Sequence, residues 1–510
     1  MNRPDIIRWK AIHKWLGLII TIFILLFCAS GIILNHREAV SEINISRAIL
    51  PSGYKITKYN NGSVRGTIRV GNDSILAYGN VGIWLTDSDF NYFSDYNKGL
   101  PNGMDRRNIK NIVQTPKGEL WCAANYNVYR NVNGRWVMLA MPTNEERISD
   151  MTLDKDSTNI IVLTRSAIYT IPINNKLNEE LRPEVSVHYL NAPDGYSPKV
   201  TLFKTIWQLH SGELFGTFGR IMVDLIAVVI IFLCMTGLAI YIMPSAIKNS
   251  IKTGVNACSK KAFMKWSVKW HNHIGYYTII FTLIIAFTGM CLRPPLMIPF
   301  VMLKTAPVPG SNLDNDNPWH DKLRGIRWDS HNNKWLLSTS DGFFITDKDF
   351  GGVPAKAKGP TPPVSPMGIT VFEEDAPGKW IIGSFSGLYR WDMTENVIAD
   401  YFTNTLYSGK EPGRPVSTAL VSGFSKDLNT ASPVIFDYKN GAEVLSENDV
   451  ISQQPMSLWN AALELHVGRC YSTFLGPFSE LFVFLSGLLL VLVLISGLIV
   501  IQRKKPKINQ

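Results

Sequence analysis

The sequence has few of the motifs with which soluble redox enzymes hold their cofactors. Its 510 residues include only six cysteines, and none of them forms a C-x-x-C pair. The usual zinc and iron–sulfur spacings are therefore absent. No glycine-rich dinucleotide-binding motif is present either, so the sequence predicts no nicotinamide or flavin domain. We expect the electron donor of any redox reaction to be external, either membrane quinol or a separate reductase.

Charged residues are scarce as well, at 18% of the chain, and they are nearly absent from four long apolar runs. Each run has about 19 to 23 residues, which is enough to cross a bilayer core of about 30 Å. The expected organisation is a helix at 1–36, an outer segment at 37–205, a helix at 206–243, a basic loop at 244–272, a helix at 273–293, an outer segment at 294–460, a helix at 461–501 and a tail at 502–510.

The net charge of +10 is concentrated next to the apolar runs. The segment before Trp15, the loop at 244–272 and the tail after Ile501 are rich in Lys and Arg, and the loop contains no Asp or Glu. The positive-inside rule places such segments in the cytoplasm. We therefore expect both termini inside and the two long segments outside. The remainder of the chain is slightly acidic, which gives no support for nucleic-acid binding.

The two outer segments contain a further repeat. "GNVGIWLTDSDF" at 79–90 matches "TSDGFFITDKDF" at 339–350. Aromatic residues recur every 40 to 45 positions at Trp84, Tyr129 and Tyr169, and again at Phe344 and Tyr389. Such a period, with short strands and Gly or Asn turns, is typical of propeller blades. The expected fold class is a four-span helical bundle, duplicated as helix–β–helix twice, with an all-β, propeller-like body. Two separate small β domains are the alternative.

The histidines follow the same duplication. His13-x-x-x-Gly17 aligns with His271-x-x-x-Gly275, and Ser30-Gly31 with Thr288-Gly289, at a constant offset of 258 residues. In the other two spans, Leu209-His210-x-Gly212 aligns with Leu465-His466-x-Gly468, and Thr236-Gly237 with Ser496-Gly497. The alignment pairs His13 with His271 at the cytoplasmic rim and His210 with His466 at the outer rim.

Two equivalent histidines that face a common axis can approach one flat ligand from opposite sides. Bis-histidine haem ligation needs that arrangement, with neutral imidazoles on facing helices. We therefore predict that His13, His271, His210 and His466 are axial ligands of haem iron, with two haem b groups per chain. Gly17 and Gly275 lie one turn beyond their histidines and are predicted to leave room for the porphyrin.

A structural alternative stands beside this interpretation. A single histidine at a membrane rim is usually an interfacial polar residue, and glycine within a span usually serves helix packing. His36 and His273 have no symmetric partner, since their counterparts are Pro294 and Trp15. We expect these two to lie near the cofactor sites, in supporting or substrate-facing roles. No catalytic residue can be named from the sequence.

The motifs "HKWLGL…SG", "LHSGELFGTFGR…TGL" and "HNHIG…TG" resemble the PepSY-associated transmembrane family of bacterial inner-membrane proteins. The resemblance implies b-type haems between the helices and similarity to ferric-siderophore reductases. It also implies a multi-pass protein of the inner membrane whose haem ligands are the four paired histidines. The outer segments depart from this pattern, because propeller-like repeats replace a PepSY domain.

Together these features predict a b-type haem protein that passes electrons across the membrane to an outer acceptor, with chelated Fe(III) as the expected substrate. As an enzyme it would be a ferric-chelate, siderophore-type reductase that serves iron acquisition. The alternative is a membrane-anchored propeller that acts as a sensor or interaction protein without redox chemistry. The absence of a cytoplasmic signalling domain in the sequence counts against that alternative.

Overall fold

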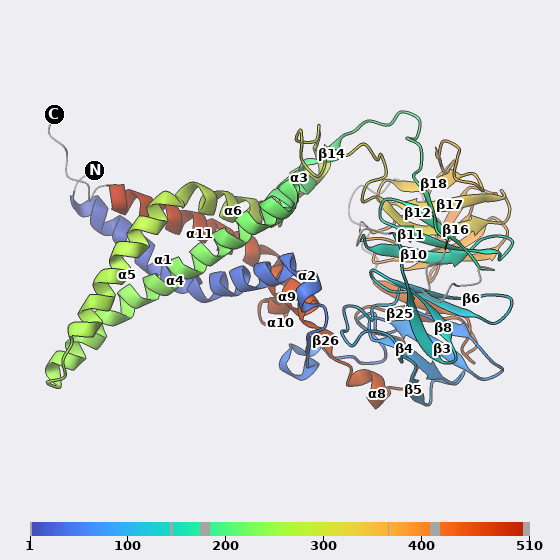
Figure 1. The fold of residues 1–510 in the computed structure, drawn as a ribbon, viewed down its shortest axis with the longest axis horizontal. Coiled ribbons are helices and arrows are strands. Elements are labelled where there is room, and N and C mark those ends of the chain that lie inside the picture. The colour runs from blue at the N-terminus through green and yellow to red at the C-terminus, as the bar shows by residue number, and fades with distance from the viewer. Residues whose placement is uncertain (1–2, 143–145, 174–183, 366, 408–418, 503–510) are drawn as a thin grey trace. The chain divides into compact units, whose positions relative to one another are not determined.

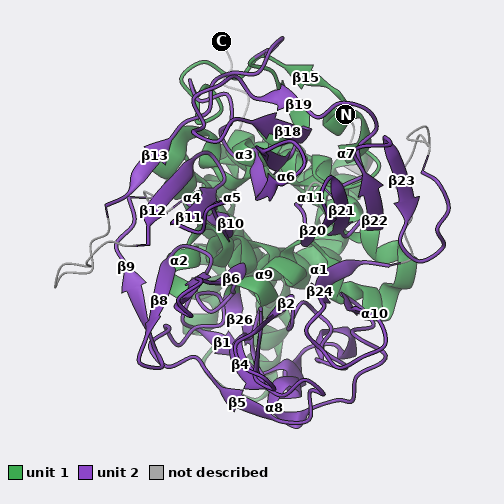
Figure 2. Ribbon diagram, turned by 90° about the vertical axis from the view of Figure 1, so that its right-hand side faces the viewer, with its two compact units in different colours: residues 1–40, 198–315, 459–510 green, residues 41–197, 316–458 purple. Residues whose placement is uncertain are grey.

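The structure is a computed structural model, and it describes residues 3–142, 146–173, 184–365, 367–407 and 419–502. The chain divides into two compact units (Figure 2). Unit 1 contains residues 1–40, 198–315 and 459–510, and unit 2 contains residues 41–197 and 316–458. Each unit is built from both halves of the chain.

Unit 1 is helical (Figure 1). Three helices are long and apolar enough to cross a membrane: α1 (Arg3–Asn35), α4 (Gly216–Lys252) and α11 (Ser479–Gln502). A fourth crossing is possible if α5 (Cys258–Tyr277) and α6 (Ile279–Cys291), which meet at a 70° bend, form one span. The chain is therefore a membrane protein. The shorter helices of this unit are α2 (Arg37–Val40), α3 (Leu202–Ser211), α7 (Met297–Met302), α9 (Leu458–His466) and α10 (Ser472–Leu475).

The helices of unit 1 pack around a small apolar core. Helix α1 contacts α4 and α11, and α11 also contacts α6. Ile20, Ile24 and Ile230 are buried where α1 meets α4. Outside the helices, β14 (Val200–Thr201) pairs with β15 (Lys304–Thr305). This pairing ties a first-half segment to a second-half segment.

Unit 2 consists of small antiparallel sheets. Among the described residues of this unit, five sheets have four strands and one has two, apart from the short pair β1 (Asn44–Ile45) and β26 (Met456–Ser457). The strands, sheet by sheet, are β2 (Gly66–Arg69), β3 (Ile75–Gly79), β4 (Gly82–Thr86) and β5 (Phe93–Asp95); β6 (Asn111–Gln114), β7 (Leu120–Ala123), β8 (Val128–Val132) and β9 (Arg135–Leu139); β10 (Ile148–Leu153), β11 (Asn159–Thr164), β12 (Ile168–Pro172) and β13 (Ser186–His188); β16 (Leu323–Asp329), β17 (Lys334–Thr339), β18 (Gly342–Thr346) and β19 (Ala355–Lys356); β20 (Val371–Ala376), β21 (Lys379–Ser384), β22 (Gly387–Asp392) and β23 (Val397–Asp400); and β24 (Val421–Ser425) with β25 (Val434–Asp437).

The first strand of each sheet contacts the first strand of the next. The series runs β2, β6, β10, β16, β20 and β24, and β24 contacts β2 again. The sheets of unit 2 therefore follow one another around a ring, as Figure 2 shows. Apolar clusters lie between neighbouring sheets, such as Leu163 of β11 with Trp335 of β17, and Ile75 of β3 with Phe436 of β25.

The recurring aromatic positions of the sequence all fall in the third strand of a sheet. Trp84, Tyr129, Tyr169, Phe344 and Tyr389 lie in β4, β8, β12, β18 and β22, and all five are buried. Three of these strands open with a glycine at positive φ, which completes the preceding tight turn: Gly82 (φ 95), Gly342 (φ 110) and Gly387 (φ 119). Positive φ is easily reached only by glycine, so the turn fixes the register of each hairpin.

The helix bounds differ from the expected segments at several positions. The segments expected as helices at 206–243 and 461–501 are interrupted after Ser211 and after His466. The basic loop expected at 244–272 is mostly helical, because α4 continues through Pro244 to Lys252 and α5 begins at Cys258. The expected helix at 273–293 is divided at Thr278 between α5 and α6. Of the expected tail at 502–510, residues 503–510 lie outside the described residues.

Candidate functional site: two pairs of facing histidines

The first pair joins α1 and α5. The imidazole rings of His13 and His271 have their centroids 6.1 Å apart, with their planes at 76°. The two residues are 258 positions apart in the sequence. The pair therefore forms because the two helices pack together, and it does not depend on a local turn.

The second pair joins α3 and α9. The ring centroids of His210 and His466 are also 6.1 Å apart, and their planes make an angle of 47°. Each histidine lies in the last turn of its helix, and a glycine in the left-handed conformation follows, Gly212 (φ 82) or Gly468 (φ 83). Such a glycine ends a helix without steric cost. The Leu-His-x-Gly motif thus places an imidazole at a helix terminus.

Each imidazole is held through Nδ1 by a Ser or Thr on a neighbouring helix. The Nδ1–Oγ distances are 3.4 Å for His13 with Ser496, 2.9 Å for His271 with Thr236, 3.1 Å for His210 with Thr288 and 3.1 Å for His466 with Ser30. Two of the rings also reach a backbone carbonyl through Nδ1. The acceptor is the Val493 carbonyl for His13, at 2.9 Å, and the Phe27 carbonyl for His466, at 3.0 Å.

The glycine after each of these hydroxyl residues lies against the same ring. A Cβ on Gly289 would lie 2.8 Å from Cε1 of His210, and the corresponding distances are 2.9 Å for Gly497 with His13, 3.2 Å for Gly31 with His466 and 3.5 Å for Gly237 with His271. The Ser-Gly and Thr-Gly dipeptides of the sequence therefore act as one unit, which we call the hydroxyl–glycine clamp. Its hydroxyl bonds Nδ1 and its glycine admits the ring edge.

The four clamps cross between the halves of the chain. His13 and His210, from the first half, are held by Ser496 and Thr288 of the second. His271 and His466, from the second half, are held by Thr236 and Ser30 of the first. Each imidazole is thus oriented by a residue from the other sequence repeat.

These bonds define the protonation of the rings. A carbonyl can only accept, so the Nδ1 atoms of His13 and His466 carry the hydrogen. That tautomer leaves a lone pair on Nε2, the atom that binds a metal in a neutral imidazole. A metal–imidazole bond is about 2.0 Å long, and the bonded nitrogen lies about 1.1 Å from the centre of its ring. When two imidazoles bind one metal from opposite sides, their ring centroids are therefore about 6 Å apart. The observed 6.1 Å in both pairs fits this value.

Each pair offers two protein ligands, and this number distinguishes between kinds of metal site. Among the described residues, no group of three or more His, Cys, Asp or Glu side chains could hold a metal ion. A protein-bound zinc ion takes three or four such ligands, whereas haem iron takes four nitrogens from its porphyrin and needs only two axial groups. Two facing histidines therefore suit haem better than a free ion.

Four other sequence-predicted residues lie outside the two pairs. Gly17 and Gly275 face Val493 and Leu233 at ordinary packing distances of 3.9 and 3.6 Å for an added Cβ, and they do not touch the histidines. His36 bonds to Asp224 through Nε2 at 2.8 Å. His273 packs edge-on against Trp270 and Tyr277. The glycines that lie against the rings are those of the clamps. The sequence showed that these glycines are repeated, but it did not indicate their contact with the histidines.

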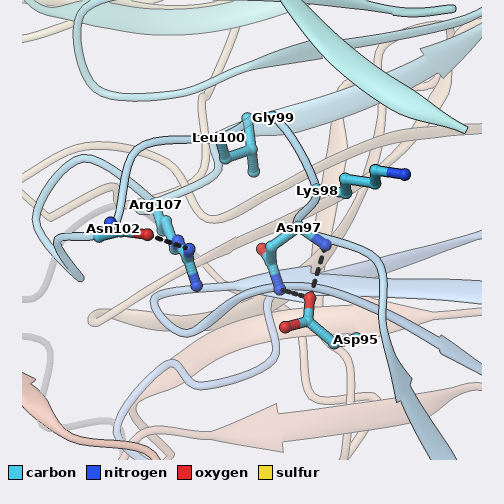
Figure 3. A pocket seen from close by; sticks show the side chains of 7 residues that line it. All are labelled: Asp95, Asn97, Lys98, Gly99, Leu100, Asn102 and Arg107. Atoms are coloured by element: carbon cyan, nitrogen blue, oxygen red, sulfur yellow. Dashed lines mark hydrogen bonds between the residues drawn. The ribbon is translucent and has the colours of Figure 1, made fainter.

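Unit 2 contributes an open surface pocket of about 240 Å³. It is lined by Asp95, Asn97, Lys98, Gly99, Leu100, Asn102 and Arg107 (Figure 3). The Asp95 carboxylate accepts bonds from the backbone and side chain of Asn97, and Arg107 bonds to Asn102. These polar groups stabilise their own loop, and their arrangement indicates no catalytic chemistry.

Comparison with known proteins gives one informative match. No curated protein sequence matches the chain. Among the solved structures that match the chain are proteins from Bacteroides thetaiotaomicron. One is a structural genomics protein of unknown function, with 11% identity, 79% of this chain and 72% of that chain covered, and a TM-score of 0.36. Another is the extracellular domain of a putative one-component system, with 9% identity, 79% and 60% covered, and a TM-score of 0.16.

The family described as the PepSY-associated TM region matches residues 10–504, nearly the whole chain. The match includes both histidine pairs and all four clamps. The chain therefore belongs to the PepSY-associated transmembrane family.

Proposed function

We propose that this chain is a membrane-bound b-type haem protein, with one haem between His13 and His271 and a second between His210 and His466. The observation that carries the proposal is the pair of 6.1 Å imidazole separations, found twice. In each pair the Nδ1 atoms are engaged by the clamps, and this supports ligation through the opposite nitrogens. When bound, haem iron would supply a one-electron Fe(III)/Fe(II) couple at each site.

Charged side chains lie next to the outer pair. Arg293 donates a hydrogen bond to the carbonyl of Val467, the residue that follows His466. Burial lowers the pKa of this guanidinium and the neighbouring Arg469 lowers it further, whereas two nearby glutamates raise it. One of these glutamates, Glu464, forms an ion pair with Arg469, so the cations already have carboxylate partners. We propose that the bond from Arg293 helps to hold the preceding histidine in place.

The two pairs are separated along the bundle. His13 and Ser30, which belong to different pairs, lie 17 residues apart on α1. At about 1.5 Å per residue this corresponds to about 26 Å along the helix axis, most of a bilayer core. We propose that the pairs mark the two faces of the bacterial inner membrane. We propose that His13 and His271 lie inside, with both termini cytoplasmic and unit 2 extracytoplasmic, and the lysine-rich segments support this orientation.

We propose that the acceptor outside is chelated Fe(III), such as a ferric siderophore, in iron acquisition. Reduction to Fe(II) weakens binding by hard oxygen ligands and would release the metal. The family resemblance of the sequence motifs supports this choice of substrate. The donor would be membrane quinol or a separate reductase, because the sequence contains no dinucleotide-binding motif.

We further infer that the chain arose by duplication of a helix–β–helix unit and that unit 2 is a six-bladed propeller. The crossing of the clamps between halves supports the first point. The closed series of contacts from β2 to β24 supports the second. The last blade has only two described strands, β24 and β25.

Proteoliposomes with unit 2 outward test the function. The haems are reduced in the vesicles, ferric citrate or a ferric hydroxamate is added outside, and the ferrous absorbance is followed. We expect rapid reoxidation in the wild type and loss of reoxidation in His210→Ala and His466→Ala. NADH alone should reduce neither haem. If no ferric chelate reoxidises the haems at any concentration, the iron assignment is wrong.

A further inference from the structure

The four clamp hydroxyls have a second bond in common. Thr288 donates to the Ile284 carbonyl at 2.7 Å, Thr236 to the Phe232 carbonyl at 2.8 Å, Ser30 to the Leu26 carbonyl at 2.7 Å and Ser496 to the Val493 carbonyl at 2.8 Å. A hydroxyl has one hydrogen and two lone pairs. Since the hydrogen is used within its own helix, the oxygen can only accept from the imidazole. The hydroxyls are therefore acceptors for Nδ1–H.

We propose that Ser30, Thr236, Thr288 and Ser496 are positioning residues that accept a hydrogen bond from Nδ1–H and lower the reduction potential of the haem on whose ligand each acts. The proposal rests on the proposed function. It adds an assignment of residues: Ser496 and Thr236 act on the inner haem, and Ser30 and Thr288 act on the outer haem. None of the four touches its iron directly.

The chemical reason is ligand basicity. An imidazole that donates Nδ1–H to an acceptor becomes a stronger donor at Nε2. A stronger donor stabilises Fe(III) relative to Fe(II), which lowers the reduction potential. Removal of the acceptor should raise it. The effect should be largest for Thr236, whose contact with His271 is the shortest of the four at 2.9 Å, and smallest for Ser496, whose contact with His13 is the longest at 3.4 Å.

Burial supports a specific role for these hydroxyls. Their exposed fractions are 1% for Ser30, 4% for Thr236, 5% for Thr288 and 0% for Ser496. A buried hydroxyl group is costly in an apolar bundle unless it is hydrogen-bonded. Thr282, also on α6, is equally buried and makes the same kind of bond to its own helix at 3.2 Å. Its hydroxyl bonds to the carbonyls of Thr278, which precedes α6, and Ile279, so it provides a matched control.

The test is a redox titration of the full-length haem-loaded protein in detergent, with each haem followed by its α-band. Thr288→Val replaces the hydroxyl by a methyl of similar size and should raise the potential of the outer haem only. Thr236→Val should raise that of the inner haem only. The expected change is a threefold to tenfold higher Fe(II)/Fe(III) ratio at fixed potential, where tenfold equals about 59 mV for one electron.

Controls separate a positioning role from packing. Thr288→Ser keeps the oxygen and should restore the wild-type potential, and Thr282→Val should leave both potentials unchanged. An unshifted outer potential in Thr288→Val, or an equal shift of both haems, would overturn the proposal while haem binding stands. A wild-type protein without haem would instead overturn the proposed function. If Thr288→Val loses the outer haem, Thr236→Val and Thr288→Ser still give the comparison.

Discussion

At the scale of single residues, the clamp glycines give a graded test of how the imidazoles are held. The Cβ of an alanine would lie 2.8 Å from the His210 ring at Gly289 and 3.5 Å from the His271 ring at Gly237. The first distance forces the ring to move, and the second is ordinary contact. We expect Gly289→Ala to lose most of the outer haem and Gly237→Ala to retain the inner one. Haem content by pyridine haemochrome measures both, with Gly17→Ala as a control that should retain both haems.

Histidine substitutions test the pairing directly. His271→Ala should remove the inner haem and spare the outer, because it deletes one of two axial ligands. His273→Ala should retain both haems, since this side chain packs against Trp270 and Tyr277 and lies outside the pair. The two residues are two positions apart on α5, so folding defects should be similar. Loss of a whole haem in His273→Ala alone would show that the pairing is wrong at this site.

The sequence predicted which histidines come together, because its two repeats align residue by residue. It did not predict what holds them. Ser496 and His13 are 483 residues apart, so their contact follows only from the packing of α11 on α1. Nor did the sequence identify the clamp glycines, rather than Gly17 and Gly275, as the glycines that lie against the rings. Helical side chains lean toward the N-terminus, so a residue four positions after a histidine lies behind its ring.

At the scale of elements, the third and fourth sheets of unit 2 are joined by a buried ion pair. Arg327 of β16 donates to Asp150 of β10 at 2.6 Å, and their side chains are 20% and 10% exposed. Asp150 also accepts from the backbone of Ile326. Asp150→Ala removes the hydrogen-bonded carboxylate and leaves Glu373 as the nearby anion, so it should lower the free energy of unfolding of unit 2 by about 2 kcal/mol. Thermal unfolding followed by tryptophan fluorescence measures this change.

The matched control is an ion pair on the surface of the same sheets. Lys348 and Asp156 lie 2.6 Å apart, but their side chains are 61% and 50% exposed. Solvent screens such a pair, so Lys348→Ala should leave the unfolding transition where it is. An equal effect of both substitutions would mean that the contact of β10 with β16 does not depend on the buried pair.

Elements were partly predictable. The aromatic period located the third strand of five sheets, because a buried aromatic follows each tight turn. The helical hairpin at 244–272 was not predicted, because hydropathy marks only the part of a helix that lies in the bilayer core. Beyond Met243, α4 continues with lysines and one proline. This composition resembles that of a basic loop.

At the scale of the whole molecule, the proposed topology predicts which side of the membrane each segment faces. Cys258 begins α5 and is exposed, whereas Cys122 and Cys291 are buried. A membrane-impermeant maleimide should label Cys258 in inverted vesicles and not in intact spheroplasts. Cys258→Ser should abolish that labelling. Cys470 is partly exposed and follows the outer pair, so this test is made in a Cys470→Ser background. Labelling of that protein from the spheroplast exterior would reverse the orientation and place unit 2 in the cytoplasm.

The central claim is that two histidine pairs hold two haems, and the visible spectrum of the purified full-length protein tests it most directly. Six-coordinate ligation by two imidazoles predicts a low-spin spectrum with sharp α and β bands on reduction, and two haem b per chain by pyridine haemochrome. Because the clamp geometry is repeated at both pairs, the proposal predicts that both sites are filled alike. A colourless protein from haem-replete cells, or a high-spin spectrum with one haem per chain, would contradict the account.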